Sequence, residues 1–208
     1  MDISGFKELM KNEDQAYDAL DKFYRCGYSV LRRHKKVKGL FISDCGLLFV
    51  DDFGDSKNRL RSLLVVIREI NKGKPFLGIC LGLQLLFTYS QEHTLAPGMN
   101  IIKGEVVKFT NDLKIPHMGW NQVEYTNNEL TKKLFKNIPQ KAYFYFVHSY
   151  YVKPKEEAII VATTWYGEIF PSAVVKNNIV GVQFHPEKSG DMGLKFLKNF
   201  LEIYGNAC

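Results

Sequence analysis

The feature that most constrains the fold is a cysteine between two glycines, at the point where a short apolar run meets a helical pattern. The run Phe76–Ile79 has the length and composition of a buried strand, and from Leu81 onward apolar residues recur with helical spacing. Gly78 and Gly82 flank Cys80, and we expect both to relieve crowding around it. The sequence therefore predicts a strand, a tight turn that carries Cys80, and a helix.

This strand, turn and helix would place Cys80 on a nucleophile elbow, where the side chain is exposed above a sheet. A helix N-terminus favours a thiolate, and the N–H group after the nucleophile can donate to the oxyanion of a tetrahedral intermediate. Cys80 is therefore a candidate nucleophile for acyl transfer, with the N–H of Leu81 as an oxyanion donor. On this motif alone, the alternative that Cys80 is a small core residue stays open.

A second segment contains the base that such a cysteine needs. Residues 181–187 read as a strand that ends at His185, with Glu187 two positions later. A nucleophilic cysteine requires a base to take and return its proton, and the base requires an acceptor that holds its tautomer. A histidine at a strand end is more often structural when it stands alone. Together with Cys80, however, His185 and Glu187 favour a catalytic triad.

The remaining pattern predicts an α/β fold. Upstream of the cysteine, residues 56–71 have the spacing of an amphipathic helix that ends near Gly73, and residues 39–42 are a candidate strand before it. Alternating helices and strands predict an open, mostly parallel sheet flanked by helices. After Pro97 most segments are short and β-rich, and a final helix is expected at residues 193–204. The β-rich segments are 101–102, 105–109, 122–125, 142–147, 158–164, 173–175 and 179–184.

Composition narrows the classes of function. Of the 208 residues, 46% are hydrophobic and 24% are charged, which is typical of a globular domain; without repeats or linkers, residues 1–208 are predicted to form one domain. No apolar run approaches the ~20 residues that span a bilayer, so we expect a cytoplasmic protein without a membrane partner. The four cysteines lack a C-x-x-C pair, which predicts no metal site. The net charge of +6 is scattered apart from the run 32–36, which argues against a nucleic-acid partner.

The residues around the cysteine and histidine resemble class I, triad-type glutamine amidotransferases. Residues 75–84 and 182–187 carry this resemblance. Within that class, residues 116–121, 142–150 and 188–190 are similar to the glutaminase subunits of imidazole glycerol phosphate synthases, which act in histidine biosynthesis. The resemblance implies the flavodoxin-like α/β fold of the class, with additional strands in the second half.

The resemblance also implies a role for each matching residue. Cys80 would attack the carboxamide of L-glutamine, His185 would pass the proton to the leaving ammonia, and Glu187 would orient His185. Water would then hydrolyse the glutamyl thioester, without a cofactor or a metal. Two further groups are implied: glutamine binding by Gly46, Leu81, Gln84, Ser149 and Tyr150, and docking of a partner by Trp120, Tyr143 and Lys188. The implied partner is a synthase subunit with a (β/α)8 barrel, which receives the ammonia within a heterodimer.

Residues 1–54 depart from the family pattern. No clear first strand is present, and residues 43–46 read SDCG where the family's oxyanion segment reads Pro-Gly-Val-Gly. An oxyanion donor contributes roughly 2.7 to 4 kcal/mol to lowering the barrier, so this change leaves two alternatives open. Besides the leading interpretation, a glutaminase subunit in histidine biosynthesis, the chain could be a paralogue that supplies ammonia to a sugar amidotransferase in surface-glycan biosynthesis, or a catalytically weak scaffold for the synthase.

Overall fold

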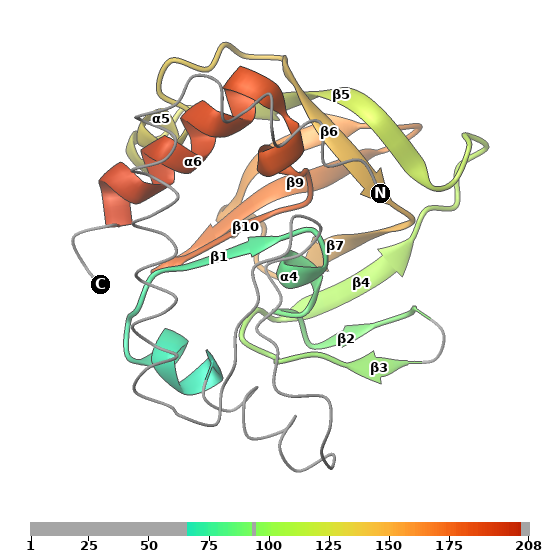
Figure 1. Ribbon diagram of the computed structural model, residues 1–208. Coiled ribbons are helices and arrows are strands. Elements are labelled where there is room, and N and C mark those ends of the chain that lie inside the picture. Colours follow the sequence, from blue (N-terminus) through green and yellow to red (C-terminus); the bar gives the residue numbers. More distant parts are fainter. Residues whose placement is uncertain (1–65, 93–94, 205–208) are drawn as a thin grey trace, which may run out of the picture.

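The computed structural model describes residues 66–92 and 95–204. These residues form two sheets with three α-helices labelled α4, α5 and α6 around them (Figure 1). The strands are β1 (Phe76–Ile79), β2 (Tyr89–Ser90), β3 (Ala96–Pro97), β4 (Gly104–Lys108), β5 (His117–Tyr125), β6 (Ala142–His148), β7 (Tyr150–Pro154), β8 (Ile160–Trp165), β9 (Ile169–Lys176) and β10 (Ile179–Val182). The labelled helices are α4 (Leu81–Gln84), α5 (Glu129–Leu134) and α6 (Gly190–Tyr204), with the 3-10 turns η1 (Glu157–Ile159) and η2 (Pro186–Lys188), and residues 66–71 are also helical.

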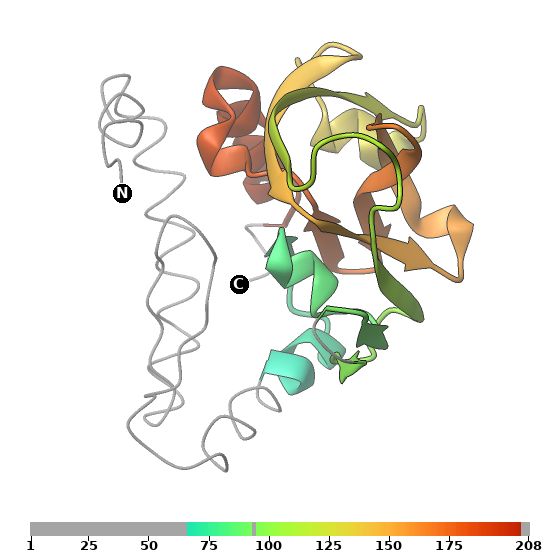
Figure 2. The ribbon, with the colours of Figure 1, turned by 90° about the vertical axis from the view of Figure 1, so that its right-hand side faces the viewer.

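The larger sheet has the strand order β1, β10, β9, β8, β5, β6, and the smaller sheet has the order β3, β2, β4, β7. In the described part of the chain, β1–β10 and β2–β4 are parallel pairs, and the other pairs are antiparallel. The strand expected at residues 39–42 lies outside the described residues. Figure 2 shows the larger sheet curling over α4, with the smaller sheet on the other side of this helix.

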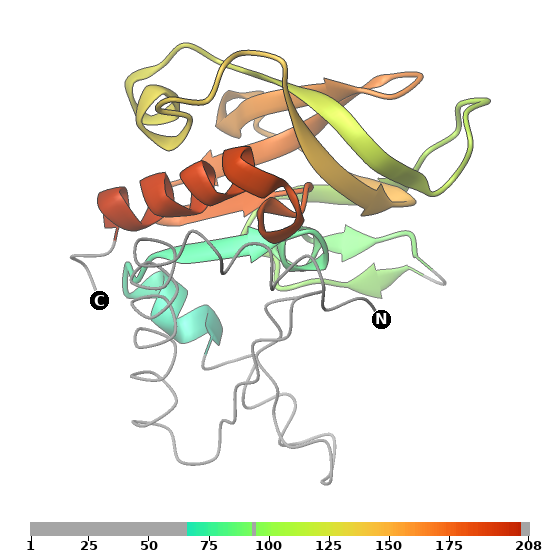
Figure 3. The ribbon, with the colours of Figure 1, turned by 45° about the horizontal axis from the view of Figure 1, so that its top comes forward.

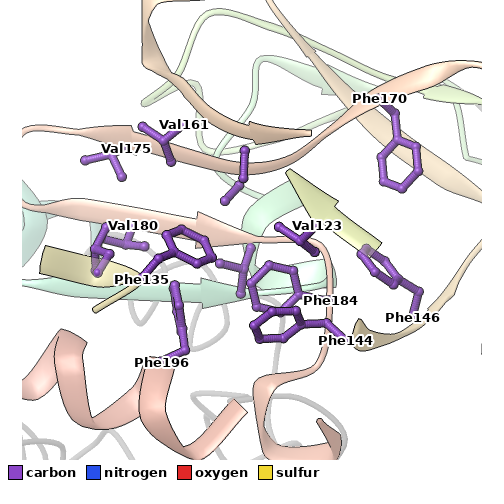
Figure 4. Close-up of a cluster of buried hydrophobic side chains, with 14 of the residues drawn as sticks. Val123, Phe135, Phe144, Phe146, Val161, Phe170, Val175, Val180, Phe184 and Phe196 are labelled. Atoms are coloured by element: carbon purple, nitrogen blue, oxygen red, sulfur yellow. The ribbon is translucent and has the colours of Figure 1, made fainter. Parts of the chain in front are cut away.

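Two apolar clusters hold these layers together. In the first, α6 lies along one face of the larger sheet (Figure 3) and its Phe196 packs against Phe184 and Phe135, with ring centroids 5.5 and 5.3 Å apart. Figure 4 shows how these rings meet Phe144 among side chains from the strands. The second cluster packs Leu83 of α4 against β4, β7 and β9. Because α4 packs against strands of both sheets, the position of Cys80, the residue just before it, is fixed.

Most of the elements expected from the sequence are present. The strand at Phe76–Ile79 is confirmed, and residues 66–71 are helical and followed by a turn at Gly73, as predicted. The prediction of a strand at 101–102 is wrong: both N–H groups of Ile101 and Ile102 donate to the carbonyl of Leu86 instead of to a strand. No helix in the described part of the chain is long and apolar enough to cross a membrane.

Candidate active site

Cys80 occupies the turn between β1 and α4 that the sequence predicts. Its backbone angles are φ 50° and ψ −107°, a left-handed conformation that a residue with a side chain adopts only under strain. Three backbone hydrogen bonds hold it: the N–H of Cys80 donates to Val182 of β10 at 2.8 Å, and its carbonyl accepts from Leu83 and Gln84. The surrounding backbone therefore holds Cys80 in a strained turn, as at a nucleophile elbow.

The two glycines that flank the turn differ. A Cβ on Gly78 would lie 2.7 Å from the carbonyl oxygen of Gly82, so β1 can approach α4 this closely only with glycine at position 78. A Cβ on Gly82 itself would meet no atom of the described residues within 4 Å. The expectation that both glycines relieve crowding is thus confirmed for Gly78 and wrong for Gly82 within this part of the chain.

His185 and Glu187 lie together as the sequence predicts. Nδ1 of His185 is 2.7 Å from Oε1 of Glu187, and His185 is only 3% exposed. Burial lowers the pKa of His185, but the hydrogen bond to Glu187 and the interactions with Cys80 and with the Glu187 charge outweigh it and raise the pKa to about 9. Nε2 of His185 is buried and makes no hydrogen bond to the described residues. The carboxylate of Glu187 therefore orients the ring through Nδ1, and Nε2 is the nitrogen that can exchange a proton with Cys80 or a substrate.

The sulfur of Cys80 lies among three groups. Sγ donates to the carbonyl of Val147 at 3.8 Å and accepts from Nε2 of Gln183 at 3.6 Å. It also interacts with His185 closely enough to raise the pKa of that ring, although Nε2 of His185 makes no hydrogen bond to the described residues. Catalytic contacts of this kind are often poorly aligned before substrate binds.

Two residues that the sequence did not single out support the triad. Gln183 is fully buried and contacts Sγ directly; it lies within residues 182–187, which carry the family resemblance, but no role was assigned to it there. Ser189 fixes His185 to β6, because its Oγ donates to the His185 carbonyl at 2.6 Å and accepts from the N–H of Tyr145 at 2.9 Å. The N–H of His185 in turn donates to the carbonyl of Tyr145 at 2.9 Å.

The predicted glutamine-binding residues lie beside the triad where they are described. Nε2 of Gln84 donates to the carbonyl of Tyr150 at 2.9 Å and to Oε1 of Gln183 at 3.2 Å. Ser149 precedes Tyr150 at the junction of β6 and β7, and Leu81 is partly exposed at the first position of α4. Gly46, together with the altered segment around it, lies outside the described residues.

The predicted docking residues are all exposed. Trp120 on β5 and Tyr143 on β6 are 55% and 54% exposed, although both are large and aromatic. Lys188 is exposed at the end of η2, the turn that carries Glu187. In the described part of the chain, no group of three or more His, Cys, Asp or Glu side chains is placed to hold a metal ion.

Comparison with known proteins gives a consistent family. The family model for class-I glutamine amidotransferases matches residues 17–203. Among curated proteins, the imidazole glycerol phosphate synthase subunit HisH 1 of Methanococcus maripaludis is 48% identical over 160 residues, which cover 74% of this chain and 77% of that protein. The subunit HisH of Methanocaldococcus jannaschii is 48% identical over 155 residues, with the same coverage, and that of Moorella thermoacetica is 46% identical over 161 residues, or 76% and 75%.

Solved structures agree on the fold. A glutamine amidotransferase structure superposes with a TM-score of 0.53 at 16% identity and covers 72% of each chain. The PurLQS structure of Thermotoga maritima gives a TM-score of 0.51 at 19% identity, with 68% of this chain and 67% of that chain covered. At such low identity the likeness concerns the fold alone.

Proposed function

The chain belongs to the class-I glutamine amidotransferase family, and from that premise we propose how its residues act and with what it assembles. Its identity of 46% to 48% with curated synthase subunits, over about three quarters of each chain, identifies the function as that of the glutaminase subunit of imidazole glycerol phosphate synthase in histidine biosynthesis. This identity favours the histidine pathway over the surface-glycan alternative.

The first half of the proposed reaction uses Cys80 and His185. The thiolate of Cys80 attacks the carboxamide carbon of L-glutamine, and the oxyanion that forms is stabilised by the N–H group of Leu81 at the start of α4. His185 carries its proton on Nε2, and as the tetrahedral intermediate collapses it gives this proton to the leaving nitrogen. Ammonia departs, and a glutamyl thioester remains on Cys80.

The second half regenerates the cysteine. His185, now neutral at Nε2, takes a proton from water, which attacks the thioester carbonyl and displaces the sulfur as L-glutamate forms. Glu187 accepts from Nδ1–H throughout, so Nε2 is the nitrogen that always exchanges the proton. The raised pKa of His185 supports this cycle, because the ring can hold a proton while Cys80 is a thiolate.

We assign glutamine binding to Gln84, Ser149 and Tyr150. The amide of Gln84 on α4 donates to the Tyr150 carbonyl. This hydrogen bond links the start of β7 to the helix that follows the nucleophile. Gly46 stays in the proposal as an oxyanion donor that the described residues do not include.

The curated relatives are named as subunits of a synthase, which supports a synthase partner for this chain. We propose that this partner is a (β/α)8 barrel in a heterodimer, that it docks on the exposed Trp120, Tyr143 and Lys188, and that ammonia passes to it across this face. The cytoplasmic location remains a prediction from the sequence.

The single observation that carries the proposed chemistry is the strained backbone of Cys80 beside the His185–Glu187 pair. We expect glutamine hydrolysis by the purified chain to be weak alone, to rise strongly when a synthase subunit is added, and to vanish in Cys80→Ala. Cys208→Ala is the matched control, since it removes another cysteine outside the proposed triad. Equal rates for wild type and Cys80→Ala with the synthase bound would contradict the glutaminase mechanism and favour the scaffold.

A further inference from the structure

Two buried histidines outside the triad face each other across the antiparallel β5–β6 pair. His117 begins β5, His148 ends β6, and the two are partners in the strand register. They are 3% and 6% exposed, and Nδ1 of His117 is 3.0 Å from Nε2 of His148. The proposed mechanism uses neither ring, so their burial needs another explanation.

The hydrogen bonds of the two histidines permit only one assignment of donor and acceptor to each ring nitrogen. Nδ1 of His148 lies 2.9 Å from the carbonyl of Tyr150, which can only accept, so Nδ1 carries the hydrogen. Nε2 of neutral His148 then accepts, and Nδ1 of His117 must donate to it. Nε2 of His117 is thereby an acceptor, and Nδ2 of Asn121 lies 3.2 Å away to supply its hydrogen.

The orientation of the Asn121 amide is fixed independently of the histidines. Its Nδ2 also donates to the carbonyl of Trp165 at 2.9 Å, and its Oδ1 accepts from the N–H of Gln122 at 2.7 Å. A flipped amide would break both bonds. Every donor and acceptor on the two rings therefore has a partner, and each ring has a single tautomer.

The surroundings keep both rings neutral. His117 is stacked between Tyr166 and Phe146, with centroids 4.0 and 4.9 Å apart, and Phe109 packs against both histidines. Burial lowers the pKa of His117 to about 4. Burial also lowers the pKa of His148 to about 3. The hydrogen bond to the Tyr150 carbonyl raises this pKa, but by less than burial lowers it. A proton on either ring would place two hydrogens against each other in the chain.

The series of hydrogen bonds that runs through the two histidines ends at the candidate active site. The Tyr150 carbonyl that His148 holds also accepts from Gln84, Gln84 bonds to Gln183, and Gln183 donates to the sulfur of Cys80. We propose that His148, held in one tautomer by His117, is a positioning residue that fixes the backbone of Ser149 and Tyr150 for glutamine. This inference rests on the proposed assignment of those two residues to glutamine binding.

The test compares two substitutions at His148 in the chain bound to its synthase subunit. His148→Phe keeps a ring but removes the donor, whereas His148→Asn keeps an N–H close to the position of Nδ1. We expect KM for glutamine to rise about tenfold in His148→Phe, as for one lost hydrogen bond, with kcat changed less than about threefold. His148→Asn should keep KM within about threefold of wild type. Alkylation of Cys80 by iodoacetamide, which needs no glutamine site, should stay within about twofold in both.

Two results would overturn the inference: an unchanged KM in His148→Phe, or equal impairment of both variants, which would indicate packing alone. A second measurement separates it from the proposed function. Long-range ¹H–¹⁵N NMR at pH 7, assigned with His117→Gln and His148→Asn, should show hydrogen on Nδ1 of both rings. Hydrogen on Nε2 of either ring contradicts the inference even if glutamine is hydrolysed. A wild-type complex that hydrolyses no glutamine but shows these tautomers contradicts the proposed function and leaves the hydrogen-bond chain supported.

Discussion

Within residues 66–92 and 95–204 histidines are buried in two places, and their pKa values move in opposite directions. His185 and His117 are both 3% exposed, and His148 is 6% exposed. The pKa of His185 is raised to about 9, whereas those of His117 and His148 are lowered to about 4 and about 3. Equal burial therefore does not determine the protonation state of a histidine in this fold.

The difference comes from the partners. His185 has the carboxylate of Glu187 at 2.7 Å and the sulfur of Cys80 nearby, and its interactions with both raise the pKa of the ring. The paired histidines meet a carbonyl, an amide and each other, which cannot offset the cost of burying a charge. His185 also keeps Nε2 without a hydrogen bond to the described residues. Reactivity thus requires an unpaired nitrogen and a charged partner, while positioning requires that every polar atom is paired.

The largest effect should follow from removing the reactive ring. In His185→Asn, we expect kcat for glutamine hydrolysis to fall at least roughly 10⁴-fold, because no group remains to move the proton between sulfur and nitrogen. The measurement is ammonia release by the synthase-bound chain, with circular dichroism to show that the variant is folded. His148→Asn, which changes the same residue type at the other location, should keep kcat within about threefold. A comparable loss in both variants would remove the distinction between the two regions.

A smaller effect should follow from neutralising the partner of His185. Glu187→Gln keeps a side chain of the same length but loses the carboxylate, so we expect kcat to fall roughly 10³-fold because Nδ1–H loses its charged acceptor. The pKa of His185 should move down when Glu187 is neutralised, since the hydrogen bond and the charge of Glu187 both raise it. NMR titration of the ring in Cys80→Ala and in Cys80→Ala/Glu187→Gln isolates the carboxylate's share. An unchanged pKa would mean that Glu187 does not set the charge of this ring.

The reactive region could be predicted because its signals are local in sequence. The glycine before Cys80 is required by a backbone approach four residues away, and Glu187 lies two residues after His185, so short windows contain most of the geometry. The strand that precedes Cys80 was equally readable from its apolar run. Even here, the roles of Gln183 and Ser189 depended on contacts with Cys80 and Tyr145, which no short window reveals.

The paired region could not be predicted because its partners are far apart in the chain. His117 and His148 are 31 residues apart, and only the β5–β6 register brings them together. The helix α5 was also missed, although Asn128 caps it by accepting from the N–H of Thr131 at 2.8 Å, a signal that a search for caps would find. Sequence patterns thus predicted the elements that carry reactive groups better than the contacts that hold them in place.

The smallest effect concerns the free energy of unfolding. The paired histidines should lower it as the pH falls, and His185 should lower it as the pH rises. The folded pKa of His148 lies below the ordinary 6.5, so its contribution is complete above pH 6.5 and is lost as the unfolded chain gains protons below it. His117 behaves alike, with a loss on the order of 3 kcal/mol between pH 6.5 and 4. His185 is raised, so its contribution is complete below pH 6.5 and is lost as pH rises through 9.

Urea unfolding of the wild type from pH 4 to 9 should therefore give a free energy of unfolding with a maximum near pH 6.5. His148→Asn should flatten the acid side, because the variant has one titrating ring fewer there, and His185→Asn should flatten only the alkaline side. Carboxylates contribute to the acid side in all three proteins, so the difference between curves, not each slope, carries the comparison. If the curves of wild type and His148→Asn run parallel between pH 6.5 and 4, His148 is not held neutral by the fold, and the contrast with His185 is lost.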